Sequence, residues 1–299
     1  MADNKSFVIL TDSTSDLNKS IREQYGIEYV KMNYVIDGKE YPASLDWEFH
    51  AAKEYYDLLR GGKHITTTQV PQELYRTVFE DALKNGKDLV YIACSSALSG
   101  SINLANVVAR ELNEQYPDNK IYCIDSLISS LGQGWMVFDA AILRQEGKTA
   151  AEVTEIIEAN KLKVNQCGTV ATLEYLRRAG RVTASKAFFG NLFGVKPLII
   201  SDIKGQNYAV KKAKGKANAY KEIANMMAEA VEGFEADELY ISHADCLEDV
   251  ELLRDIILSV VPFKKVYIDI IGPIVGTSVG PGTVISFCKG KEVTIEGKE

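Results

Sequence analysis

Clusters of short hydroxyl side chains are the most suggestive chemical feature of this 299-residue sequence. They occur in residues 11–16, 66–69 and 95–101, each of which follows an apolar run or leads into a helical pattern. In an open parallel sheet, ligands bind beyond the carboxyl ends of the strands, where such segments converge. Helix N-termini at that edge offer free N–H groups to an anion. Because none of the three segments contains Arg or Lys, a carboxylate fits better than a phosphate.

Helix capping is the alternative explanation for these hydroxyl groups. Asp16, Thr68 and Ser99 are all of residue types that cap helix N-termini. A cap needs a single side chain, whereas each of the three segments supplies several. We therefore expect the segments to present hydroxyl donors to the acidic head of a small ligand, and capping remains the alternative for any one of them.

Residues 272–283 form a glycine-rich segment with a second candidate site residue, Ser278. Its Gly276-x-Ser278-x-Gly280 pattern matches the nucleophile elbow of α/β hydrolases only formally. Pro281 and the β-branched residues after it predict a strand, whereas an elbow requires a helix. All three histidines also precede Ser278, whereas that class of hydrolase needs one after its serine. The segment is either a turn between strands or a loop that approaches a ligand, with Ser278 as a hydrogen-bond donor.

Arg181 is the basic residue best placed to act on a ligand. It ends a run with three arginines in five positions and lies just past a glycine, so it could reach a ligand or the phosphate of a partner. A solvated helix end is the ordinary explanation of such a run. The other basic run, residues 211–216, is interpreted as a solvated edge, because a net charge of −7 and a pI near 5.3 disfavour nucleic-acid binding.

An enzyme acting on a small acid or phosphoester is the alternative function, with Asp12 or His243 as its general base. No Cys, His, Asp or Glu set has metal-ligand spacing, and no nucleotide-binding motif occurs. The five cysteines are interpreted as buried thiols. Without a secretory pattern or a run of about 18 apolar residues, the sequence predicts a soluble, cytoplasmic protein with no membrane insertion.

The elements that must position these residues follow from the hydrophobic pattern, in a chain that is 46% hydrophobic and 25% charged, as globular proteins are. Strands are predicted at residues 7–10, 27–34, 89–93, 121–124, 197–202, 207–211, 239–242, 266–271 and 283–288. Helices are predicted at residues 71–84 and 102–114, and a long helix that ends at residue 232 is predicted after the strand at 207–211. Asp37-Gly38 predicts a hairpin turn. Because the pattern changes near residue 160, we expect a two-domain α/β protein: residues 1–160 with a mostly parallel sheet and flanking helices, and residues 161–299 with a mixed α/β sheet.

Taken together, these segments resemble the DegV family of bacterial fatty-acid-binding proteins over almost the whole chain. The matching pieces are residues 11–17, 67–69, 95–101, 175–182 and 276–282. Two departures occur. Ser278 stands where the family commonly has a His that helps to hold the head group, and Thr68 and Val70 stand where it has Ser and Pro.

The resemblance implies a protein that encloses one long-chain fatty acid between its two domains and is not itself a catalyst. It also implies a partner, a separate ATP-binding fatty acid kinase subunit that phosphorylates the presented carboxylate, and hence a place in phospholipid metabolism. By position, the resemblance implies that Thr67, Ser278 and one serine of the 95–101 loop hold the carboxylate. In that loop Ser99 is the first choice and Ser96 the second. Arg181 would lie near the head group and the docking surface. Supporting roles fall to Asp12, Ser13, Thr68, Gly276 and Thr277. No cofactor, metal or nucleic-acid partner is implied.

Overall fold

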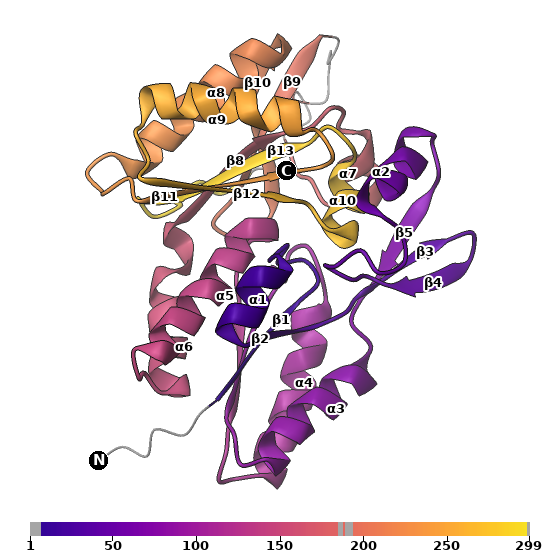
Figure 1. Ribbon diagram of the computed structural model, residues 1–299, viewed down its shortest axis with the longest axis vertical. Coiled ribbons are helices and arrows are strands. Elements are labelled where there is room, and N and C mark those ends of the chain that lie inside the picture. Colours follow the sequence, from indigo (N-terminus) through magenta and orange to yellow (C-terminus); the bar gives the residue numbers. More distant parts are fainter. Residues whose placement is uncertain (1–6, 185–187, 189–193, 298–299) are drawn as a thin grey trace.

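Two lobes, each built on its own β-sheet, make up the structure (Figure 1). It is a computed structural model that describes residues 7–184, 188 and 194–297. The lower lobe in Figure 1 contains the first part of the chain and the upper lobe contains the last part, with a small three-stranded sheet projecting beside their junction.

The N-terminal lobe is a four-stranded parallel sheet covered by helices on both faces. Its strands are β1 (Val8–Asp12), β2 (Ile27–Val30), β6 (Leu89–Ala93) and β7 (Ile121–Asp125), in the order β2-β1-β6-β7. The helices are α1 (Lys19–Tyr25), α3 (Gln72–Lys84), α4 (Ser101–Gln115), α5 (Ser130–Gln145) and α6 (Ala150–Asn160). All five residues of β6 are buried, as expected for a central parallel strand. The predicted parallel sheet with crossover helices is confirmed.

The projecting sheet consists of antiparallel strands β3 (Asn33–Ile36), β4 (Lys39–Pro42) and β5 (Ile65–Thr68), with helix α2 (Ala52–Arg60) before β5. The predicted turn is confirmed: Asp37 and Gly38 both have positive φ, as a type I′ hairpin requires. The single strand expected at 27–34 is wrong, because the chain leaves the parallel sheet after Val30 and starts β3 in another sheet.

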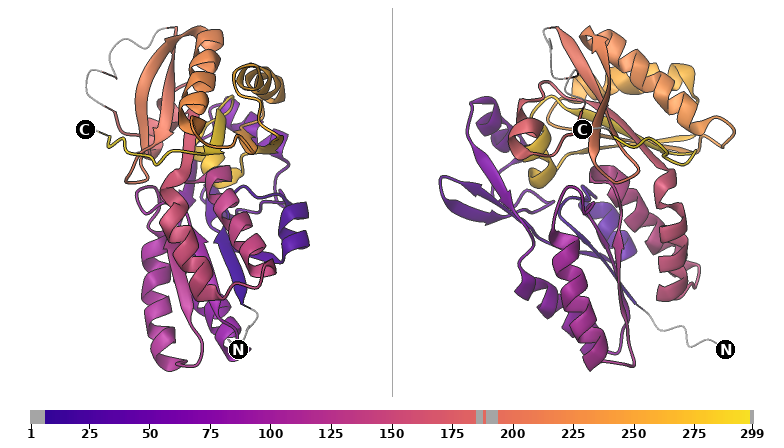
Figure 2. Two further views of the ribbon diagram at one scale, coloured as in Figure 1. Left: turned by 90° about the vertical axis from the view of Figure 1, so that its left-hand side faces the viewer. Right: turned by 180° about the vertical axis from the view of Figure 1, so that it is seen from behind.

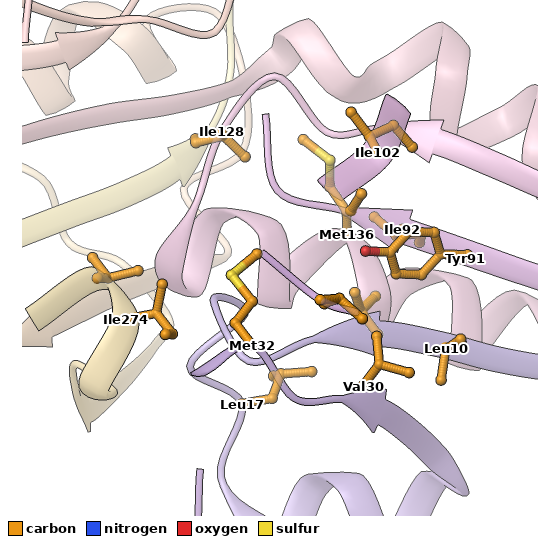
Figure 3. Close-up of a cluster of buried hydrophobic side chains, with 14 of the residues drawn as sticks. Leu10, Leu17, Val30, Met32, Tyr91, Ile92, Ile102, Ile128, Met136 and Ile274 are labelled. Atoms are coloured by element: carbon orange, nitrogen blue, oxygen red, sulfur yellow. The ribbon is translucent and has the colours of Figure 1, made fainter. Parts of the chain in front are cut away.

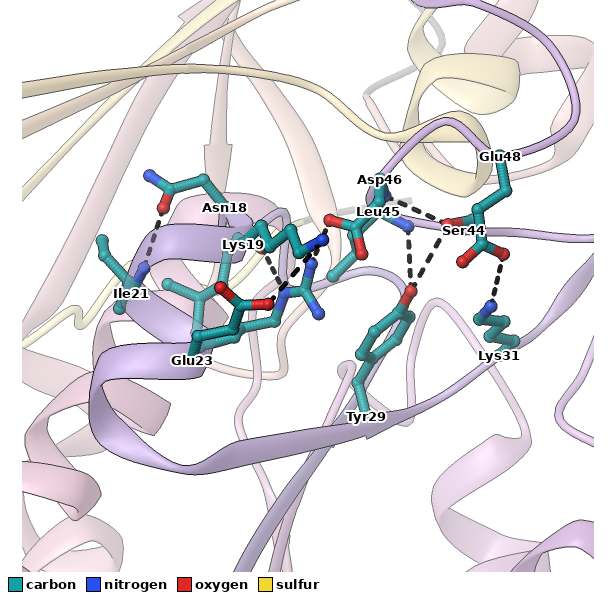
Figure 4. A network of polar contacts seen from close by, with 12 residues as sticks. Asn18, Lys19, Ile21, Glu23, Tyr29, Lys31, Ser44, Leu45, Asp46 and Glu48 are labelled. Carbon is teal, nitrogen blue, oxygen red and sulfur yellow. Dashed lines mark hydrogen bonds and ion pairs between the residues drawn. The ribbon is translucent and has the colours of Figure 1, made fainter.

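Polar contacts fix the segment that follows β4 against β2 (Figure 4). The hydroxyl of Tyr29 accepts a hydrogen bond from the Leu45 N–H at 3.3 Å, and the Ser44 hydroxyl accepts one from the Asp46 N–H at 3.1 Å. Lys31 and Glu48 form an ion pair at 2.7 Å. These contacts tie the projecting sheet to the parallel sheet.

The C-terminal lobe is a six-stranded mixed sheet whose outer face is covered by two helices (Figure 2). Its strands are β8 (Val164–Thr169), β9 (Val195–Ser201), β10 (Asn207–Lys214), β11 (Glu238–His243), β12 (Lys265–Ile270) and β13 (Val284–Lys289), in the order β10-β9-β8-β13-β11-β12. The covering helices are α8 (Gly215–Val231) and α9 (Leu247–Val260). The remaining elements are the 3-10 turn η1 (Lys161–Lys163) and the short helices α7 (Glu174–Ala179) and α10 (Pro273–Val279). Among the described strands of this sheet, β11 and β12 are the only neighbours that pair in parallel, so the expected mixed sheet is confirmed.

The glycine-rich segment forms helix α10, whereas we expected either a turn between strands or a loop that approaches a ligand. Gly272 precedes the helix in an extended conformation, and Pro273 occupies its first turn, where a missing N–H costs nothing. Gly280, with a φ of 76°, ends the helix. The strand signal after Pro281 was correct, but the start of a helix at Pro273 was overlooked.

The largest apolar core continues from the N-terminal lobe into α10 and the inner face of the mixed sheet. Figure 3 shows Ile274 of α10 beside Met32 and Leu17 of the N-terminal lobe, with Ile128 close by. Because buried apolar side chains join the lobes, the segments at their junction are held in fixed relative positions.

Candidate functional site

A cavity of about 100 Å³ lies where the carboxyl edge of the parallel sheet meets β5, α10 and the mixed sheet. Its lining residues are Thr14, Met32, Thr67, Thr68, Gln69, Cys94, Leu98, Ser99, Gly100, Ser129, Gln166, Arg181, Asn207, Ile274, Val275, Ser278, Val279 and Ile285. Thr14 follows β1 and Cys94 follows β6, the neighbouring strands between which the order of the parallel sheet reverses. This is the edge at which open α/β sheets bind ligands.

The structure brings residues of the three hydroxyl-rich segments to one cavity, although residues 66–68 belong to strand β5 of the projecting antiparallel sheet and not to a loop of the parallel sheet. Thr14, Thr67 and Ser99, one from each segment, all line the cavity, and Ser278 reaches it from α10. Arg181, which follows α7, lines it as well. Residues that are far apart in the sequence therefore surround one space.

The hydroxyl groups of Thr67 and Ser278 have no hydrogen-bond partner within the described ranges. The Ser99 hydroxyl donates to that of Ser101 at 3.1 Å and accepts from the Ser101 N–H at 3.3 Å. An unpartnered hydroxyl in a cavity is available to a ligand, because a polar group left without a hydrogen bond costs free energy. The cavity thus presents donors that the protein itself does not use.

Capping does not account for the candidate hydroxyls. Helix α1 is capped by Asn18, whose side chain accepts from the Ile21 N–H at 3.0 Å, and not by Asp16. Helix α3 follows Pro71, and α4 follows Gly100. None of the three residues that could have been caps occupies the cap position.

Five of the other candidates lie outside the cavity lining: Ser96, Gly276, Thr277, Asp12 and Ser13. Ser96 is exposed, and its N–H donates to the Asp125 carboxylate at 3.1 Å. Thr277 lies on the face of α10 toward α2, where its hydroxyl is hydrogen-bonded to Tyr55. Gly276 lies on the same face, and a Cβ there would come within 2.5 Å of the Tyr56 hydroxyl oxygen. These two residues position α10.

Asp12 and Ser13 shape the floor beneath the cavity. The buried Asp12 carboxylate accepts from the N–H groups of Thr14 at 2.9 Å and Cys94 at 3.1 Å, and from the Tyr91 hydroxyl at 3.0 Å. The Ser13 hydroxyl accepts from the Met32 N–H at 3.0 Å. Asp12 therefore fixes the segments after β1 and β6 relative to each other.

Neither candidate base of the alternative enzyme lines the cavity. The Asp12 carboxylate is surrounded by the donors described above, and the Nδ1 atom of His243 accepts from the Cys246 N–H at 3.3 Å. Burial lowers the pKa of His243. Burial, with a further contribution from Asp12, raises the pKa of the Cys94 thiol, so this thiol is protonated at neutral pH.

The charge balance of the cavity favours an anion. Arg181 is the one cationic residue of the described lining, which contains no carboxylate. The guanidinium is anchored, since its Nε donates to the Leu98 carbonyl at 3.0 Å. No three His, Cys, Asp or Glu side chains of the described residues could hold a metal ion together.

Sequence reasoning missed three polar residues of the lining. Ser129 belongs to the segment after β7, and Gln166 and Asn207 come from β8 and β10. The Gln166 side-chain amide donates to Asn207 Oδ1 at 3.3 Å. Ser129 could have been predicted, because it lies in a polar segment after the predicted strand 121–124, just as residues 11–16 and 95–101 follow predicted strands. Gln166 and Asn207 carried no such signal.

Fold and site together define a two-lobed α/β protein with an anion-compatible cavity at the junction of its lobes. A family model described as an uncharacterised protein of the DegV family matches residues 6–289. The chain therefore belongs to the DegV family. A DegV domain-containing protein of Clostridium perfringens is 35% identical over 286 residues, which cover 96% of this chain and 98% of the relative.

Two solved structures have the same fold. One is a DegV family protein from Thermus thermophilus for which fatty acid binding is described. It matches this chain with a TM-score of 0.86 and 28% sequence identity, and the match covers 95% of this chain and 99% of that one. A stearic acid-binding protein from Eubacterium ventriosum has a TM-score of 0.84 at 21% identity, with 95% and 98% covered, and supports the fold alone. Within the described part of the chain, no helix is long and apolar enough to cross a membrane.

Proposed function

We propose that this protein binds a long-chain fatty acid, with the carboxylate held in the cavity by hydroxyl groups. The observation that carries the proposal is the pair of unpartnered hydroxyls, Thr67 and Ser278, in a described lining with one cation and no carboxylate. A buried carboxylate needs donors of this kind, because without them it would be protonated or excluded. The fatty acid binding described for the Thermus thermophilus relative supports the same ligand class.

Thr67, Ser99 and Ser278 are the proposed carboxylate ligands, with Thr68 and Arg181 beside them. Ser99 would turn its hydroxyl from Ser101 toward the ligand, exchanging a hydrogen bond between neutral groups for a stronger one to a charge. The family's His is absent at Ser278, and a serine hydroxyl supplies a donor at the same position.

The acyl chain is proposed to extend from this cavity toward the mixed sheet. A smaller cavity of about 20 Å³ shares Gln166, Asn207, Val279 and Ile285 with the first and adds apolar residues, among them Val170, Leu176 and Ile199. Each methylene buried there contributes about 0.8 kcal/mol, so the chain supplies most of the affinity. The first cavity has a volume of about 100 Å³, room for about three waters at liquid density. This is too little for a long acyl chain, so side chains must move apart on binding.

Extraction of the purified protein with organic solvent, followed by mass spectrometry, tests this function. We expect about one long-chain acid per chain, or its uptake when delipidated protein is incubated with oleate. Protein that yields no lipid and takes up none would refute the proposal.

We further propose that the protein presents the bound carboxylate to a separate ATP-dependent kinase in the cytoplasm and is not the catalyst. In that reaction a carboxylate oxygen attacks the γ-phosphorus of ATP, and ADP leaves. The partial exposure of Thr67 and the exposure of Arg181, both in the cavity lining, support an approach from outside. ADP release from oleate-loaded protein plus a fatty acid kinase subunit, but from neither alone, is the expected result. Release by this protein alone would contradict it.

A further inference from the structure

Ser129 lies in the segment after β7, and its side chain makes no hydrogen bond within the described structure. It precedes the 16-residue helix α5 as its N-cap residue, yet it makes no side-chain capping bond. Only 8% of the residue is exposed, it lines the cavity, and its hydroxyl has no hydrogen-bond partner among the residues that the structure describes.

The neighbours of Ser129 all use their polar groups within the protein. The Ser126 hydroxyl donates to the Ile128 carbonyl at 2.9 Å, and the Ser130 hydroxyl donates to Asp16 Oδ2 at 2.5 Å. The Ser130 N–H donates to the Thr14 carbonyl at 2.8 Å. These bonds fix the backbone around Ser129, so its hydroxyl is held at the cavity wall.

A hydroxyl at this place is suited to an anionic oxygen. The first turn of a helix carries partial positive charge, which stabilises a negative group beside the N-cap. The one cation of the described lining, Arg181, already donates to the Leu98 carbonyl, so a carboxylate gains from a second source of positive potential. Because Ser129 lines the cavity and its hydroxyl is not engaged by the protein, it is free to donate to a ligand oxygen.

We propose that Ser129 is a ligand-binding residue that donates a hydrogen bond to the carboxylate of the bound acid, with α5 supplying positive potential. This inference rests on the proposed function and adds to its ligands a fourth hydroxyl, from the segment after β7. If α5 supplies this potential, the protein should bind an acid more tightly than an uncharged lipid of the same chain length.

The test measures binding of myristate and of tetradecan-1-ol to delipidated protein by equilibrium dialysis, together with the Tm of each variant. Ser129→Ala should weaken myristate binding about tenfold and leave Tm nearly unchanged. Ser129→Asp keeps a good N-cap residue but places a negative charge beside the carboxylate. It should abolish myristate binding and retain tetradecan-1-ol.

Thr149→Ala is the matched control, because Thr149 caps α6 with a complete capping box and does not line the cavity. It should lower Tm and leave myristate binding intact. Ser129→Ala that binds myristate like the wild type, or lowers Tm as Thr149→Ala does, would overturn the inference. Loss of both ligands in Ser129→Asp would do so too. A wild-type protein that binds no fatty acid would instead refute the proposed function.

Discussion

Hydroxyl groups at the cavity differ in how far the protein itself uses them. Ser101 accepts from the Val70 N–H at 3.4 Å and contacts Ser99, so it belongs to the loop structure. Thr67 and Ser278 have no partner among the described residues. Thr67 and Ser278 therefore differ from Ser101 in what their hydroxyls contact, a difference that residue type alone does not reveal.

The pair Ser99 and Ser96 provides a test at the scale of single residues. Ser99→Ala and Thr67→Ala should each weaken fatty-acid binding by about 1 to 3 kcal/mol, because each removes a hydrogen bond to a charged group. Ser96→Ala should leave affinity unchanged, since Ser96 is exposed and outside the described lining. Titration of the three variants with oleate measures these differences. Unchanged affinity in both Ser99→Ala and Thr67→Ala would contradict the head-group assignment.

Residue types in the sequence predicted the polar character of the site but not its full membership. Ser96 and Ser99 are equivalent by type, and the loop between β6 and α4 decides which of them reaches the cavity. Gln166 and Asn207 lie on strands whose pattern predicts only pairing, and they reach the cavity because the mixed sheet packs against the parallel one. Such contacts between distant segments have no local signature.

At the scale of elements, buried parallel strands were the most predictable part of the fold. Strand β6 has the predicted bounds, because an apolar run of five residues between polar turns is long enough for a buried strand and too short for a buried helix. Helix α10 was missed because four of its seven residues are β-branched, which disfavours a helix locally. It is stabilised by packing against α7, β5, β3 and α2, and the Tyr55 hydroxyl of α2 donates to the Pro273 carbonyl at 2.9 Å. The domain boundary near residue 160 stays a prediction.

For the whole molecule, the buried carboxyl group of Asp16 connects the two lobes. Asp16 Oδ1 accepts from the Gly272 N–H at 2.9 Å, at the start of α10. Asp16 Oδ2 accepts from the Ser130 hydroxyl, which lies 3.0 Å from the Ser242 hydroxyl oxygen in β11. Burial, with smaller contributions from Asp269 and Asp12, raises the pKa of Asp16 to about 8. At neutral pH this link between the lobes is therefore largely uncharged.

Protonation of Asp16 makes the stability of the molecule depend on pH. Unfolded Asp16 loses its proton near pH 3.8, whereas the folded protein keeps it until about pH 8, so folding takes up a proton between these values. The free energy of unfolding should fall by up to about 1.4 kcal/mol per pH unit across that range and level off above it. Asp16→Asn mimics the protonated acid and should reduce this slope, whereas Asp37→Asn in the exposed hairpin should not. Urea unfolding at several pH values measures the slopes, and equal slopes for the wild type and Asp16→Asn would show that Asp16 is ionised in the folded protein.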